Sequence, residues 1–125
     1  MDYKGTIIEE SLANQEVLDD IAILSTKVER VVEKHQTPWL TRWTLHQVEI
    51  PEAQAEDVAR KLSQGLESEH NWYADYKNEK WHYIIFRGKV FKIDRLSADQ
   101  YLEARKYGIA QGIPEYQVDF SPDIK

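Results

Sequence analysis

Residues 72–94, WYADYKNEKWHYIIFRGKVFKID, decide the fold. They contain three runs of aromatic and β-branched residues, at 72–77, 81–86 and 89–93, and such residues are enriched in β-strands. Short polar breaks separate the runs, and the second break is the dipeptide Arg87-Gly88. The pattern predicts a three-stranded antiparallel meander over residues 72–94.

A two-residue turn at each connection places Asp75 directly opposite His82 in the first hairpin. Because side chains alternate between the faces of a strand, the same turns sort the other residues of the meander. One predicted face carries Asp75 and His82 among aliphatic and Phe side chains. The other face carries four large aromatic residues: Trp72, Tyr76, Trp81 and Tyr83. Both faces are thus apolar, which a sheet with one solvent-exposed face would not show.

Two helices flank the meander in the sequence. Residues 51–66 begin with a proline, which suits a first helical position, and continue with an apolar stripe at helical spacing. Residues 98–111 follow Ser97, which opens a capping-box pattern, and Gly112 and Pro114 stop the second helix.

The first fifty residues add further strands. Residues 42–50 alternate like a strand, and residues 6–10 form a short strand or a lead-in. Residues 21–33 fit both a helix face and a strand, and their β-branched content favours the strand. We therefore predict an α+β two-layer sandwich, in which an antiparallel sheet of about five strands carries the helices 51–66 and 98–111 on one face.

Composition limits the possible functions. The chain has 125 residues, the size of one domain, and we expect a single domain over residues 1–125. The absence of cysteine excludes a disulfide framework and a cysteine nucleophile. No apolar run reaches the roughly 18 residues of a membrane span, and the first ten residues turn acidic where a signal peptide would be apolar. We expect a soluble cytoplasmic protein that binds no cofactor and no membrane.

Asp75 and His82 are the candidate catalytic residues. A carboxylate that holds one nitrogen of an imidazole orients the other nitrogen, as a general base requires. Tyr73 or Lys77 would lie nearby and complete the site of a small enzyme. The alternative is a cross-strand pair that only stabilises the sheet.

A metal site is not expected. The four histidines, His35, His46, His70 and His82, show no HxH or HxxxH spacing that would direct two imidazoles at one ion. Ordinary polar or core histidines explain them.

The face with Trp72, Tyr76, Trp81 and Tyr83 is the candidate binding surface. Tryptophan and tyrosine are enriched in interface cores, so this face favours a non-catalytic interaction module that forms a homodimer or binds a protein or small-molecule ligand. The alternative is a cover formed by residues 1–20 or by the C-terminal tail. Trp39, near the tip of a predicted hairpin, is a further candidate contact, although a loop that folds back onto the sheet is the favoured interpretation.

Residues 77–95 contain six basic and two acidic side chains interleaved with aromatic residues. Such a strip resembles the sheets on which single-stranded nucleic acid stacks its bases. Lysines on a strand are also typical of a solvated edge that prevents aggregation. The net charge of −6 makes a nucleic-acid partner unlikely.

Three blocks carry a resemblance: residues 72–78 (WYADYKN), residues 86–91 (FRGKVF) and residues 112–115 (GIPE). They resemble blocks of small prokaryotic proteins of uncharacterised function, mainly over residues 42–120. The resemblance implies a small prokaryotic α+β protein. It implies no activity, cofactor or catalytic residue.

Overall fold

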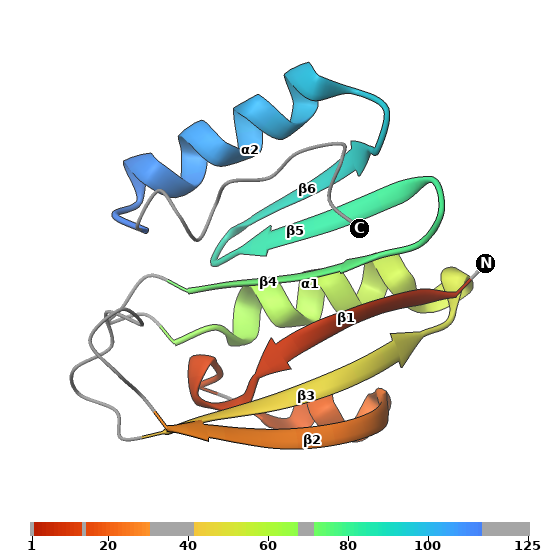
Figure 1. Ribbon diagram of the computed structural model, residues 1–125, viewed down its shortest axis with the longest axis vertical. Helices are drawn as coiled ribbons and strands as arrows, with labels where there is room; N and C mark the ends of the chain where they lie inside the picture. The colour runs from red at the N-terminus through yellow and green to blue at the C-terminus, as the bar shows by residue number, and fades with distance from the viewer. Residues whose placement is uncertain (1, 14, 31–41, 68–71, 114–125) are drawn as a thin grey trace.

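A computed structural model describes residues 2–13, 15–30, 42–67 and 72–113 (Figure 1). The strands are β1 (Tyr3–Ile8), β2 (Ala22–Arg30), β3 (Arg42–Ile50), β4 (Tyr73–Lys77), β5 (Trp81–Phe86) and β6 (Lys89–Asp94). The helices are α1 (Ala55–Gly65) and α2 (Ala98–Ala110), and the short 3-10 helices are η1 (Glu9–Ser11), η2 (Gln15–Asp20) and η4 (Glu52–Gln54). The meander and both predicted helices are confirmed.

The six strands form one antiparallel sheet in the order β2-β3-β1-β4-β5-β6, which confirms the α+β class (Figure 1). The sheet has one strand more than the expected five or so because β1 is a full strand that lies between β3 and β4. Tyr3 pairs with Ile50 of β3, and Thr6 pairs with both Gln47 of β3 and Asp75 of β4. The segment predicted as a short strand or a lead-in, residues 6–10, thus overlaps a strand at the centre of the sheet.

The expectation that both helices pack on one face is wrong. Tyr76 of β4 donates its hydroxyl to the carbonyl of Ala55 in α1, whereas His82 of β5 hydrogen bonds with Tyr101 of α2. His82 lies opposite Lys77 and shares its face, and Lys77 is next to Tyr76 in β4. The side chains of Tyr76 and His82 therefore project from opposite faces of the sheet. The physical reason is the meander itself, since both of its faces are apolar and each is covered by a helix.

Each face has its own core. The larger core joins α1, η1 and η2 to the face that carries the Trp and Tyr side chains, and it includes Tyr3, Ile7, Leu12, Leu18, Val58, Leu62, Trp72, Tyr76 and Tyr83. The smaller core lies under α2 and consists of Ile84, Phe86, Ile93, Tyr101, Ala104 and Ile113. The cover expected from residues 1–20 is therefore present.

Gly5 lets β1 approach β4 closely. A Cβ atom built on Gly5 would lie 2.1 Å from the carbonyl oxygen of Asp75 and 2.7 Å from the Cα atom of Tyr76. Both contacts are with backbone atoms, so the rotation of a flexible side chain cannot relieve them. Pairing between β1 and β4 therefore requires glycine at this position.

We expect Gly5→Ala to lower the free energy of unfolding by about 1–3 kcal/mol or more, because overpacking forces the two backbones apart. Urea unfolding followed by tryptophan fluorescence measures the loss. Lys4→Ala, at an exposed neighbouring position, is the control and should change little. Equal stability of the two variants would contradict the role given to Gly5.

Three tyrosines in the larger core should make the free energy of unfolding fall with rising pH in the alkaline range. Burial raises the pKa of Tyr76 far above its usual value of 10.0, and burial also raises the pKa of Tyr3 and Tyr83. The folded chain thus keeps these protons at pH values at which the unfolded chain loses them. This contribution to stability is complete below pH ~10 and falls as the pH rises above it.

We expect Tyr76→Phe to show a shallower decline of unfolding free energy above pH ~10 than the unchanged chain. At pH 8 the variant should be less stable by about 1 kcal/mol, because it lacks the hydrogen bond to Ala55. Urea titrations at pH 8, 9, 10 and 11 provide both values. Parallel declines in the two proteins would show that this phenol does not titrate as described.

Candidate functional site

The first hairpin differs from its predicted register by two residues. Asp75 lies opposite Ile84, and His82 lies opposite Lys77, so the turn is centred on Glu79 and Lys80, one residue later than predicted. Asn78 holds this turn, since its N–H donates to the carbonyl of Trp81 (3.0 Å) and its Oδ1 accepts hydrogen bonds from the backbone N–H groups of Lys80 (2.9 Å) and Trp81 (2.7 Å). A shift of two preserves the alternation of faces. The second hairpin, with Arg87-Gly88 as a two-residue turn, has the predicted register.

Asp75 and His82 are nevertheless in contact. As diagonal neighbours on one face, they form a hydrogen bond of 2.7 Å between Asp75 Oδ2 and His82 Nε2. The other imidazole nitrogen, Nδ1, lies 3.0 Å from the hydroxyl of Tyr101 in α2. Burial raises the pKa of Tyr101, so this hydroxyl keeps its proton and can donate it to Nδ1.

This geometry fits a structural clamp better than a catalytic pair. The His82 side chain is only 2 % exposed, and both of its nitrogens are bonded inside the protein. A general base must offer a nitrogen to the substrate, and His82 has none available. Of the two expected companions, Tyr73 packs against the smaller core, and Lys77 lies directly opposite His82. Asp75, His82 and Tyr101 instead join β4, β5 and α2.

The candidate binding face is mostly covered by the chain itself. Trp72, Tyr76 and Tyr83 are buried in the larger core. Trp81 is half-buried, and its ring lies 4.7 Å from the Lys92 ammonium and 5.5 Å from that of Lys80. Trp39 lies outside the described residues. A face packed under α1 offers no surface for a homodimer, so self-association would have to use another part of the molecule.

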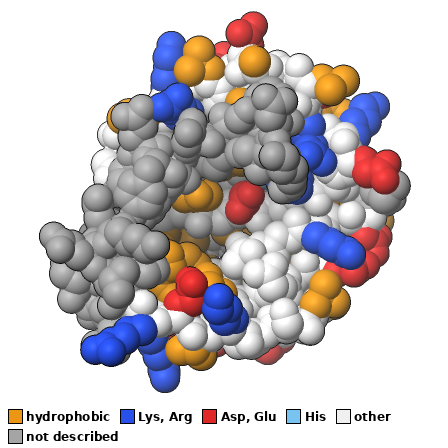
Figure 2. All heavy atoms as spheres, in the orientation of Figure 1, with side chains coloured by type: hydrophobic (Ala, Val, Ile, Leu, Met, Phe, Trp, Pro, Cys, Tyr) orange, Lys and Arg blue, Asp and Glu red, His pale blue; other side chains and the backbone are white. Residues whose placement is uncertain are grey.

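In the basic strip, residues 77–95, lysines lie over aromatic rings of the same chain. Lys92 lies over both Trp81 and Tyr83, and Lys89 lies over Phe91. Rings capped by lysines of the same chain are not open platforms for bases. Figure 2 shows Lys and Arg side chains scattered over the visible face rather than gathered in one patch. These contacts support the solvated-edge interpretation of the strip.

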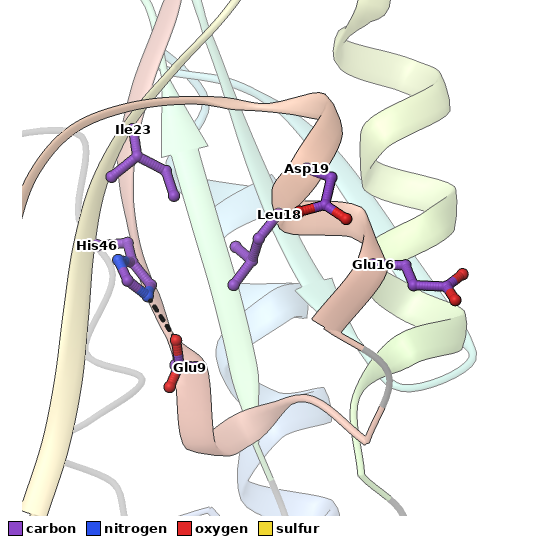
Figure 3. Close-up of a pocket in the computed structure, with 6 residues that line it drawn as sticks. All are labelled: Glu9, Glu16, Leu18, Asp19, Ile23 and His46. Carbon is purple, nitrogen blue, oxygen red and sulfur yellow. Dashed lines mark hydrogen bonds and ion pairs between the residues drawn. The ribbon is translucent and has the colours of Figure 1, made fainter.

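A second buried histidine lies beside a pocket that the sequence did not reveal. His46 of β3 contacts Thr26 of β2 through Nδ1 (2.9 Å) and Glu9 of η1 through Nε2 (3.1 Å). The pocket has a volume of about 470 Å³ and is lined by Glu9, Glu16, Leu18, Asp19, Ile23 and His46 (Figure 3). In the alternating stretch 42–50, His46 shares one side with Val48 and Ile50, which are buried, and this alternation is the signal of its burial in the sequence.

The groups around this pocket do not converge on a common point. In Figure 3 the carboxylate of Glu16 points away from His46, and Leu18 lies between Asp19 and the imidazole. Both nitrogens of His46 are occupied by protein partners. Within the described residues, no group of three or more potential ligands could hold a metal ion. The His46 contacts serve to fasten β2 and η1 to β3.

β2, which lies at one edge of the sheet, is the most exposed of the described strands. Eight of its nine residues are exposed, and Glu29 is half-buried. Three aliphatic side chains are among them: Ile23 is 42 % exposed, Leu24 56 % and Val28 58 %. Long apolar edge strands are templates for pairing with another chain, and proteins usually shield them. The sequence predicted this strand but not its place at the edge.

At alternate residues of β2, the backbone N–H and C=O groups face away from β3, toward the edge of the sheet. The N–H of Thr44, directly opposite Val28, donates to Glu10 Oε1 at 2.6 Å, on the β1 side of β3. Directly opposite residues of an antiparallel pair either exchange both hydrogen bonds or exchange none. Val28 therefore turns its N–H and C=O toward the open edge, and by alternation so do Thr26 and Arg30.

No family model matches the chain, and no curated protein or solved structure is significantly similar to it. Among the described residues, no helix combines the length and hydrophobicity that a membrane crossing requires. The resemblance to small prokaryotic proteins therefore remains a prediction.

We expect Tyr101→Phe to lower the free energy of unfolding by about 1–3 kcal/mol, because it leaves the buried Nδ1 of His82 without its donor. Tyr107→Phe is the matched control on α2, since the ring of Tyr107 packs on Phe86 and Phe91 and is retained. Thermal and urea unfolding measure both. A Tyr101→Phe variant as stable as the control would mean that the hydroxyl does not clamp α2.

Proposed function

We propose that this protein is a non-catalytic interaction module that binds an extended protein segment as an additional strand along β2. One observation carries the proposal: β2 is an edge strand whose side chains are exposed on both faces and whose outward backbone groups at Thr26 and Val28 face the open edge. Strand addition takes its affinity from such main-chain groups and its specificity from alternate side chains. The exposed Ile23, Leu24 and Val28 supply an apolar surface for those contacts.

The enzyme alternative has less support. The imidazoles of His82 and His46 each bond two protein partners, and the described pocket contains no convergent catalytic groups. The lysine-capped rings of the meander give nucleic-acid binding little support as well. A cytoplasmic location is part of our proposal and rests on the sequence.

The test uses Val28, whose N–H faces the edge and does not bond β3. Val28→Pro removes that N–H and introduces a ring at the edge without removing a hydrogen bond of the sheet. Val28→Thr keeps both the N–H and a β-branched side chain, and is the control. A random library of nine-residue peptides displayed on phage is selected against the unchanged protein.

We expect enriched peptides to bind Val28→Thr with only a small loss of affinity, because its N–H is kept, and to bind Val28→Pro at least about tenfold more weakly than the unchanged protein, since the outward hydrogen bonds are lost. Biolayer interferometry with synthetic copies of the enriched peptides measures these affinities, and circular dichroism checks that each variant is folded. A library that yields no binders, or binders that tolerate proline at position 28, would refute strand addition at β2.

A further inference from the structure

We infer that the segment bound by β2 is β2 of a second copy, so that two chains form one continuous twelve-stranded sheet with its two-fold axis at Val28. The inference rests on the proposed function and names its partner. The homodimer expected from the sequence used the aromatic face, which is mostly buried. The inferred dimer instead uses β2, at the opposite edge of the sheet from β6. Figure 1 shows β2 along the lower rim of the sheet, away from α2.

The backbone limits the possible registers. In an antiparallel pair, a residue whose groups face the partner must lie opposite another residue of the same kind. The outward groups of β2 belong to Thr26, Val28 and Arg30, so even-numbered residues must pair with even-numbered residues. A two-fold axis at Val28 satisfies this condition, and Thr26 then pairs with Arg30 of the second copy.

The other two-fold registers are less favourable. An axis at Lys27 or at Glu29 places two like charges directly opposite each other, which destabilises a strand pair. An axis at Thr26 places Leu24 within the paired segment, and the pairing of β2 with β3 shifts register between Ile23 and Ser25, as in a β-bulge. The Val28 register begins beyond this irregularity and has no like charges in opposition.

Charge complementarity supports the same axis. With Val28 at the axis, each Lys27 lies opposite Glu29 of the second copy, and the arrangement occurs twice in the dimer. Lys27 and Glu29 share one face of β2, since Lys27 Nζ lies 3.7 Å from Glu29 Oε2 within the chain. On the other face the exposed side chains of Val28 meet at the axis. A strand with this sequence is therefore complementary to itself.

The dimer is held by few residues, and this sets the expected behaviour. Residues 26–30 of each copy pair, so the contact is small and the association should be reversible and concentration-dependent. Sedimentation velocity of the full chain over a range of concentrations measures the dissociation constant. We expect the unchanged protein to dimerise, Val28→Thr to form a weaker dimer because it keeps the outward N–H but places a hydroxyl at the axis, and Val28→Pro to remain monomeric.

Charge reversal tests the register. Lys27→Glu places two carboxylates opposite each other twice, and Glu29→Lys does the same with ammonium groups. Each variant alone should dimerise at least about tenfold more weakly than the unchanged protein, because two favourable cross-strand pairs become repulsive. An equimolar mixture of the two variants should regain the lost affinity, since every position 27 then faces an opposite charge at position 29.

The outcomes separate this inference from strand addition in general. A protein that stays monomeric at all concentrations, yet binds selected peptides through Val28, retains the proposed function and loses the second copy as partner. A dimer that survives Val28→Pro uses another surface and overturns the inference. A dimer that Val28→Pro abolishes but that the mixed charge variants fail to restore overturns the Val28 register. Circular dichroism of every variant excludes unfolding as the cause.

Discussion

The fold depends on the pairing of β1 with two strands that are far apart in the sequence. β1 joins β3 on one side and β4 on the other, so it connects the N-terminal strands to the meander. Gly5 makes this possible, because any Cβ at that position would meet the backbone of Asp75 and Tyr76. Without β1 the meander and the β2–β3 pair would be separate small sheets, and a two-stranded sheet such as β2–β3 is only marginally stable alone.

Once the sheet is joined, the apolar character of both meander faces determines where the helices lie. α1 covers the face of Tyr76 and Tyr83, and α2 covers the face of His82 and Phe86. Polar contacts also join the layers: Ser63 of α1 donates to the carbonyl of Phe86 (2.7 Å), and Tyr101 of α2 bonds His82. Aromatic residues that resemble an interface in the sequence are thus used to attach helices. β2 receives no comparable cover.

The sequence predicted the elements better than their partners. Alternation and capping signals are local, so the meander, α1 and the start of α2 at Ser97 followed from the residues alone. The Asp75–His82 contact was also predicted, although the turn held by Asn78 shifts the strands by two residues. The place of β1, the burial of His46 and the exposure of β2 depend on long-range pairing, which no local pattern encodes. Gly5 was the one available signal, since an interior glycine in a strand often marks close backbone approach.

The two edges of the sheet are protected to different degrees, and the difference follows from side chains. At β6, Lys89 and Lys92 lie over aromatic rings and keep charge along the edge. At β2, Thr26 is held by His46, and Lys27 and Glu29 approach each other, so these two charges offset one another and Arg30 is the remaining charge. Protective edges normally carry uncompensated charge that repels a second strand. With the axis at Val28, Arg30 lies opposite Thr26 and meets no like charge, so this edge lacks that repulsion. Its outward backbone groups and exposed Val28 then favour pairing with a strand of the same sequence.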